Sequence, residues 1–153
     1  MNPVPALSEL VPLIGTWRLT LWGGSFLPDP EERVDAGLVH VTWIEDGAAL
    51  AILQRTDEDG PPAARWIIGR DQDEDHYTVL YSDARGVSRV YLMSFASGQW
   101  QLWRENPGFA QRFQAMVSDD GSRMTGHWEK ALDGGPWEHD FNVEYARVLD
   151  ESG

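Results

Sequence analysis

The sequence predicts an all-β domain of about ten antiparallel strands, arranged either as an up-and-down barrel or as a sandwich. Apolar and polar residues alternate with a period of two along most of the chain, which is typical of half-buried strands. Turn-forming pairs separate these segments, among them Asp46-Gly47, Ser97-Gly98 and Asp133-Gly134. Glycine in such a pair accepts the positive φ of a tight hairpin turn, so neighbouring strands are expected to pair.

A helical turn or two is expected over Pro5–Leu13, limited by Pro12 because proline has no N–H to donate. Its apolar side chains would plug one end of the strand assembly. The first strand follows at Thr16–Trp22. The stretch Gly23–Ala36, rich in glycine, proline and acids, predicts an irregular loop longer than a hairpin connection. Such a loop is either a lid over a binding site or an ordinary solvent loop.

The remaining strands follow at regular spacing, with a polar loop at Asp57–Ala64 and an acidic loop at Asp71–Asp75 between them. They are expected at Leu38–Glu45, Ala48–Thr56, Arg65–Arg70, His76–Ser82, Val87–Ala96, Gln99–Glu105, Phe109–Val117, Arg123–Lys130 and Trp137–Val148. The length favours a single domain over residues 1–153, with a strand core at 14–148 and a frayed tail at 149–153.

The turn at Asp133-Gly134 predicts the register of the last hairpin. A two-residue turn there places Trp128 opposite His139 and Gly126 opposite Phe141. The inner face would then carry Trp128, Trp137, His139, Phe141, Val143 and Tyr145. The other face would pair Arg123 with Glu144 and His127 with Asp140.

The Ser97-Gly98 turn similarly pairs Phe95 with Trp100, Met93 with Leu102, and Tyr91 with Arg104, and Arg89 continues that face. The local pattern leaves open which face is inside, because Val90, Leu92 and Trp103 share the opposite one. The position of Arg112 depends on the next turn. A three-residue loop at Asp119–Gly121 puts Arg112 beside Trp128, whereas a four-residue loop puts Phe113 there.

The formal net charge of −13 excludes nucleic acid and anionic membranes as expected partners, because such a surface repels phosphate groups. The absence of cysteine excludes disulfides and thiolate chemistry. No segment resembles a signal peptide or a membrane span, so a cytoplasmic location is expected. Eight tryptophans suit either a core or a ligand cavity.

At Gly15-x-Trp17 the chain resembles the lipocalin (calycin) superfamily. The resemblance implies one antiparallel barrel of about ten strands, closed at one end by the N-terminal helix. It also implies structural roles for Gly15, for Trp17 and for Arg147, the basic residue expected to cover that tryptophan.

A longer set of motifs resembles a group of small bacterial lipocalin-like proteins classed as a domain of unknown function. These motifs include Trp66–Asp71, Tyr77–Tyr91, Pro107–Phe113, Gly126–Lys130 and Trp137–Phe141. The start Leu13–Trp17 is also similar to that of nitrobindin, a barrel that binds haem through a histidine. The glycine-spaced run after that start and the C-terminal histidine motif of nitrobindin are absent, so no cofactor is predicted, and haem is kept only as an alternative.

Candidate binding residues come from the expected inner faces. A neutral imidazole at His139 could donate, accept or ligate, or could be a core histidine bonded to a neighbour. Arginine inside a barrel holds a carboxylate or phosphate bidentately, and Arg89, Arg104 and Arg112 are the candidates; otherwise they form surface salt bridges. Tyr91, Trp128 and Phe141 would form the aromatic wall.

Two acidic groupings have the composition of metal sites but are expected to be solvated. His127-x-Glu129 with Asp140 is predicted to be a surface salt-bridge cluster. The loop Asp71–Asp75 lacks the spaced glycine and terminal glutamate of a calcium loop. No metal site and no catalytic residue is therefore predicted.

The favoured function is binding of a small apolar or amphipathic molecule inside the barrel, with an anionic ligand as one option. One alternative is a hydratase, isomerase or cyclase that uses His139 or Tyr91 as an acid or base. Another is a solid barrel, filled by its own side chains, that acts as an interaction domain.

Overall fold

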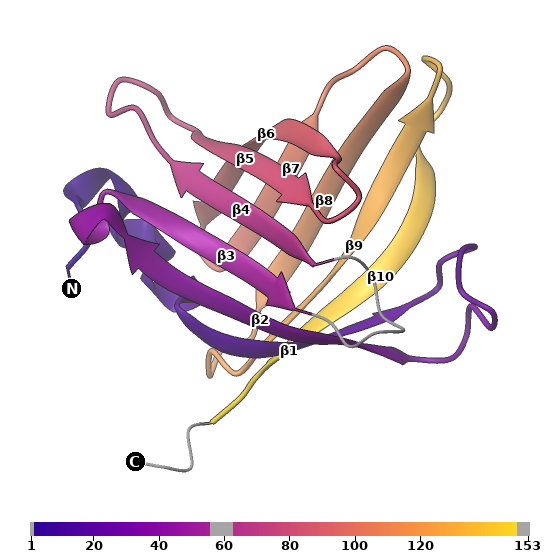
Figure 1. Ribbon diagram of the computed structural model, residues 1–153, viewed down its shortest axis with the longest axis horizontal. Coiled ribbons are helices and arrows are strands. Elements are labelled where there is room, and N and C mark those ends of the chain that lie inside the picture. Colours follow the sequence, from indigo (N-terminus) through magenta and orange to yellow (C-terminus); the bar gives the residue numbers. More distant parts are fainter. Residues whose placement is uncertain (1, 56–62, 150–153) are drawn as a thin grey trace.

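The computed structural model describes residues 2–55 and 63–149 and shows a closed barrel of ten antiparallel strands (Figure 1). Each strand pairs with its sequence neighbours, and β1 also pairs with β10, so the sheet closes on itself. The all-β barrel predicted from the sequence is confirmed, and the sandwich is excluded. The predicted loop at Asp57–Ala64 lies almost wholly outside the described residues, as does the tail beyond Leu149.

The strands are β1 (Gly15–Trp22), β2 (Val34–Ile44), β3 (Ala49–Arg55), β4 (Ala64–Gly69), β5 (Tyr77–Asp83), β6 (Ser88–Ala96), β7 (Gln99–Arg104), β8 (Phe109–Val117), β9 (Arg123–Leu132) and β10 (Glu138–Arg147). Two 3-10 helices accompany them, η1 (Pro5–Leu13) and η2 (Glu45–Gly47). Among the described residues, no helix has both the length and the hydropathy needed to span a bilayer.

One end of the barrel is filled. The η1 helix lies against this end (Figure 1) and buries Leu7, Leu10 and Leu13 completely or almost completely. Next to them Trp17 is fully buried, and its indole N–H donates to the Leu13 carbonyl at 2.9 Å. The buried apolar residues are continuous from this helix into the inner faces of the strands. We call this the closed end.

Arg147 covers the closed end from the last strand. Its guanidinium lies 4.1 Å above the Trp17 ring and donates to the carbonyls of Ile14, Pro12 and Gly121. Gly15 has a φ of +136°, and a Cβ at this position would collide with Arg147 Nη1. A side chain there would thus both strain the backbone and displace the arginine.

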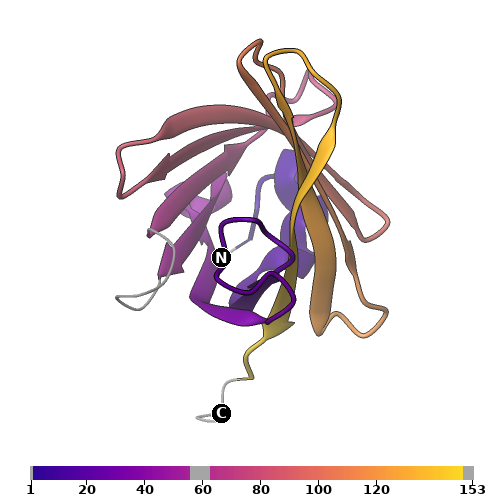
Figure 2. The same cartoon turned by 90° about the vertical axis from the view of Figure 1, so that its right-hand side faces the viewer.

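The opposite end is the open end, where β1 leads into β2. Figure 2 looks at the barrel from this end and shows the loop between these strands in front of the barrel interior. Strand β2 begins at Val34, earlier than the predicted Leu38, so this loop is shorter than expected from the sequence. The early start is accommodated by an irregularity in the pairing with β1 between Arg18 and Thr20, close to Gly37 with its φ of +97°.

The predicted register at Ser97-Gly98 is confirmed. Phe95 pairs with Trp100 and Met93 with Leu102, and all four side chains are buried, which settles that this face is inside. The exposed Val90 marks the outside. The sequence left open whether Arg112 or Phe113 lies beside Trp128, and the structure places Phe113 there.

The predicted register of the last hairpin is wrong. Phe141, not His139, lies opposite Trp128, and Val143 lies opposite Gly126. Pairing begins only at Glu138, after Pro136, which has no N–H for the ladder, and a second shift occurs between His139 and Phe141. The first shift is one residue and moves His139 off the predicted inner face. The second adds another residue, and because side chains alternate with a period of two, Phe141 and Val143 return to that face.

Candidate ligand-binding site

The open half of the barrel encloses a cavity of about 810 Å³, within the size range of pockets for small molecules. The solid-barrel alternative is therefore wrong for this half of the molecule. The cavity is lined by aromatic, aliphatic and a few polar side chains from most of the strands and from the β1–β2 loop. Its aromatic residues are Phe26, Trp66, Tyr81, Tyr91, Phe109, Trp128, Phe141 and Tyr145.

The aromatic rings of the wall contact one another. Trp66 stacks on Tyr91 with centroids 5.8 Å apart and 21° between the planes, and Tyr81 meets both rings edge-on. The ring centroid of Trp128 lies within 6.3 Å of the ring centroids of Trp66, Tyr91 and Phe141. Such packed rings hold a fixed shape and present a large apolar surface to the interior.

The β1–β2 loop covers part of the mouth. The ring of Phe26 contacts Phe141 edge-on at a centroid distance of 5.3 Å, and Leu27 and Pro28 also line the cavity. Phe26 nevertheless exposes 58% of its surface. The loop expected to be either a lid or a solvent loop therefore contributes directly to the cavity wall.

A polar group lies within this aromatic wall. Gln111 is only 8% exposed, and its side-chain oxygen accepts from the Tyr91 hydroxyl at 2.6 Å and from Arg89 Nη1 at 3.2 Å. Burial raises the pKa of Tyr91, and the neighbouring Arg89 opposes that shift. Burial also raises the pKa of Tyr145, because it removes the phenol from water. Both phenols therefore stay protonated in the neutral pH range.

Two arginines line the cavity, and their surroundings differ. Arg85 donates through Nη2 and Nε to the Asp83 carboxylate, which is fully buried and also accepts from the Tyr81 hydroxyl at 2.7 Å. These donors, led by Arg85, hold the pKa of Asp83 far below its usual range, and burial together with Asp83 raises the pKa of Tyr81. Among the described residues, no carboxylate lies within ion-pair distance of Arg89.

Four of the seven predicted ligand-binding residues line the cavity: Arg89, Tyr91, Trp128 and Phe141. Arg104 does not line it, and instead donates to the Phe109 carbonyl at 2.7 Å. His139 also lies elsewhere, because it pairs with Glu129, whose side chain is on the outer face. There its ring stacks on that of His127, with centroids 6.1 Å apart, and its Nε2 forms a hydrogen bond with Asn142 Oδ1 at 3.0 Å.

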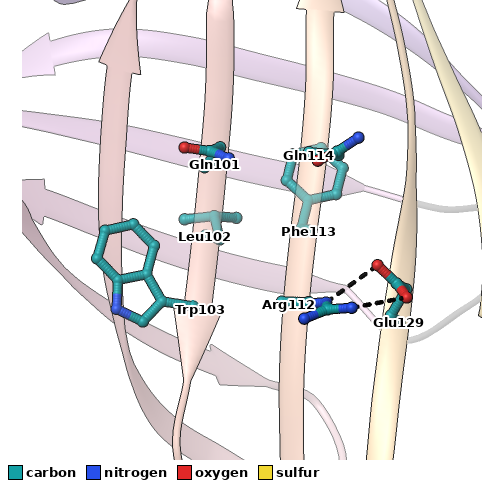
Figure 3. Close-up of a pocket in the computed structure, with 7 residues that line it drawn as sticks. All are labelled: Gln101, Leu102, Trp103, Arg112, Phe113, Gln114 and Glu129. Atoms are coloured by element: carbon teal, nitrogen blue, oxygen red, sulfur yellow. Dashed lines mark hydrogen bonds and ion pairs between the residues drawn. The ribbon is translucent and has the colours of Figure 1, made fainter. Parts of the chain in front are cut away.

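Arg112 is the third predicted residue outside the cavity. It forms a bidentate ion pair with Glu129 on the outer face of β8 and β9 (Figure 3) and lies over the Trp137 ring at 4.2 Å. Trp137 is thus also on the outside, contrary to the predicted inner face. Arg112 and Glu129 border a shallow depression of about 140 Å³, whose other walls include Gln101, Trp103 and Gln114.

Sequence reasoning missed several residues of the cavity. Asp140 lines it in place of His139, with Lys130 Nζ 3.7 Å from its carboxylate. Trp66 and Tyr81 alternate correctly for an inner face, so their strand pattern could have identified them. Gln111 carried no such signal, because a single glutamine next to Arg112 gives no indication of which residue points inward.

No histidine lines the cavity, although all four of them lie in the described part of the chain. An imidazole-ligated haem therefore does not fit this site. The described residues contain one group with the spacing of metal ligands, Glu74, Asp75 and His76 in the β4–β5 loop, and both acids of this group are exposed. His127 is 3.6 Å from Glu129, and that contact belongs to the outer ion-pair cluster with Arg112.

No family model and no curated protein matches this sequence. Among solved structures, the chain is similar to Rv2717c from M. tuberculosis, with a TM-score of 0.64 and 14% sequence identity. The likeness covers 96% of this chain and 99% of that one. At this identity it shows a shared barrel fold.

Proposed function

We propose that this protein binds a small, largely apolar or amphipathic molecule in the open half of its barrel. The observation that carries the proposal is the aromatic-walled cavity of about 810 Å³. An apolar guest would remove its own surface and that of the wall from water, which contributes roughly 25 cal/mol per Å² buried before the costs of binding. Lipocalin-like membership and a cytoplasmic location, expected from the sequence, are part of this proposal.

Binding is favoured over catalysis by the position of the titratable groups. The imidazole of His139, which would serve an enzyme as acid or base, lies on the outer surface. Tyr91 donates a hydrogen bond from its hydroxyl to the side-chain oxygen of Gln111, and burial raises its pKa, so near neutral pH the phenol stays protonated and is not available as a base. We therefore put no reaction forward.

Filling the cavity tests this function. Leu21 lines the cavity, so Leu21→Trp should occupy part of its volume and weaken binding of the fluorescent amphipathic probe 1-anilinonaphthalene-8-sulfonate by at least about tenfold. The matched control is Val90→Trp, at an outward-facing position that is 54% exposed. The control should keep the affinity of the original protein. Equal affinities in all three proteins, in a fluorescence titration, would contradict the proposal.

A further inference from the structure

The cavity contains one cation whose charge the described residues leave without a carboxylate. Arg85 is neutralised by the buried Asp83, whereas in the described part of the chain Arg89 has only the neutral oxygen of Gln111 as a hydrogen-bond partner. The Arg89 guanidinium also lies 5.2 Å from the Phe109 ring, at the start of β8. An arginine in these surroundings has donors available for an incoming anion.

The orientation of Gln111 adds a second donor. Arginine can only donate, so the side-chain oxygen of Gln111 must face Arg89, and its NH₂ group must point elsewhere. Within the described residues, this NH₂ group has no hydrogen-bond partner, and it is not among the buried atoms left unsatisfied. Because Gln111 lines the cavity, the NH₂ group is free to donate to a ligand.

Acidic side chains on the same lining restrict which anion can enter. Asp29 and Glu32 border the cavity, as does Asp140 with Lys130 beside it, and the whole chain carries a formal charge of −13. Each additional negative charge on a ligand would be repelled by this field. A singly charged acid group is therefore favoured over a dianion such as a phosphate monoester.

We propose that the ligand is a monocarboxylate with an apolar body, and that Arg89 and the Gln111 amide bind its carboxylate. This inference rests on the proposed function and specifies the ligand class. Arg89 is the second residue of β6, close to the open end, and Tyr91 lies two residues deeper. The carboxylate thus lies just inside the mouth, and the apolar body extends inward along Trp66 and Trp128.

The test compares two probes of the same shape by isothermal titration calorimetry. 2-Naphthylacetic acid carries the carboxylate, and 2-naphthylacetamide replaces it with a neutral amide. The original protein should bind the acid roughly ten- to a hundredfold more tightly, the range expected for hydrogen bonds to charged groups. 2-Naphthyl phosphate, measured at pH 8 as a dianion, should bind no better than the amide.

Two variants assign the preference to the proposed residues. Arg89→Met removes the cation and keeps an apolar stem, so the acid should bind no more tightly than the amide. Gln111→Glu supplies Arg89 with an internal carboxylate of the same shape, and should abolish acid binding while the amide still binds. Arg65→Gln removes the same charge from an exposed outer position on β4 and should keep the full preference.

The outcomes separate the two levels of the proposal. If the original protein binds acid and amide equally, or if Arg89→Met retains the preference for the acid, the carboxylate inference is overturned and the cavity function stands. Tighter binding of the phosphate than of the acid also overturns it. If none of the three probes binds, both the inference and the proposed function fail.

Discussion

At the scale of single residues, the partner of a side chain decides what it can do. Arg85 and Arg89 are separated by three residues and both line the cavity, but of the two only Arg85 has a carboxylate partner among residues 2–55 and 63–149. Asp83 accepts hydrogen bonds from Tyr81, from Arg85 and from the backbone of Arg85 and Val87, so the β5–β6 turn is held by one buried carboxylate. That arrangement holds Arg85 in place, and Arg89 is the arginine that we propose to bind a ligand.

Asp83→Asn should therefore destabilise the fold. The amide keeps the shape but loses the charge-assisted bonds, which are worth about 2 kcal/mol. Because Arg85 and the other donors lower the folded-state pKa of Asp83, its contribution is fully present above the unfolded-state pKa of about 3.9. It is lost as the pH falls below that value towards the folded-state pKa. In urea unfolding, the difference between the two proteins should be large at pH 7 and smaller at pH 3.

Asp35→Asn is the matched control. Asp35 forms an ion pair with Arg18 in which both side chains are at least half exposed, so its loss should change the free energy of unfolding by no more than about 0.5 kcal/mol. A difference for Asp83→Asn that stays constant between pH 7 and pH 3 would contradict the assigned role of its charge.

At the scale of elements, the two predicted hairpins show what a sequence pattern can and cannot specify. At Ser97-Gly98 both turn residues have positive φ, and the strands on either side contain no residue that interrupts the ladder. Asp133 and Gly134 have the same signs of φ, but Pro136 follows them and pairing starts later. A turn signal gives the register only where the residues next to it can pair.

The cavity residues follow the same rule. Regular alternation placed Trp128 and Phe141 on the predicted inner face, and both line the cavity. For Tyr91 the alternation gave the residues that share its face but left open whether that face was inside. Pairing that starts late after Pro136 puts the predicted histidine opposite the outward-facing Glu129, and the irregularity between His139 and Phe141 leaves Asp140 on the lining. No local pattern signals that irregularity, because it depends on how β10 pairs with β9. Gln111 was missed for a different reason, since its role requires Arg89 and Tyr91 from a strand that does not pair with β8.

The closed end provides a prediction at this scale. Gly15→Ala should destabilise the protein by about 2 kcal/mol, because the backbone has a φ of +136° and the added Cβ would displace Arg147 from the carbonyls it holds. Gly69→Ala, at the end of β4, is the control, since no atom lies within 4 Å of the Cβ it adds. Equal melting temperatures for these two variants would show that the closed end does not depend on Gly15.

At the scale of the whole molecule, the barrel is divided into a filled half and a hollow half. The η1 helix, Trp17 and the inner-face side chains near them occupy the closed end, while aromatic walls surround the space at the open end. The filled half supplies the buried apolar area that stabilises the fold. The hollow half can therefore be kept open for a guest.

The central claim is that this hollow half holds a small molecule, and native mass spectrometry of the protein purified from its own host tests it most directly. The predicted spectrum contains a species heavier than the bare chain by the mass of one small molecule. The heavier species should disappear when the protein is denatured. Its fraction of the total signal should be lower in Leu21→Trp but unchanged in Val90→Trp. Repeated spectra containing only the mass of the bare chain would contradict the claim.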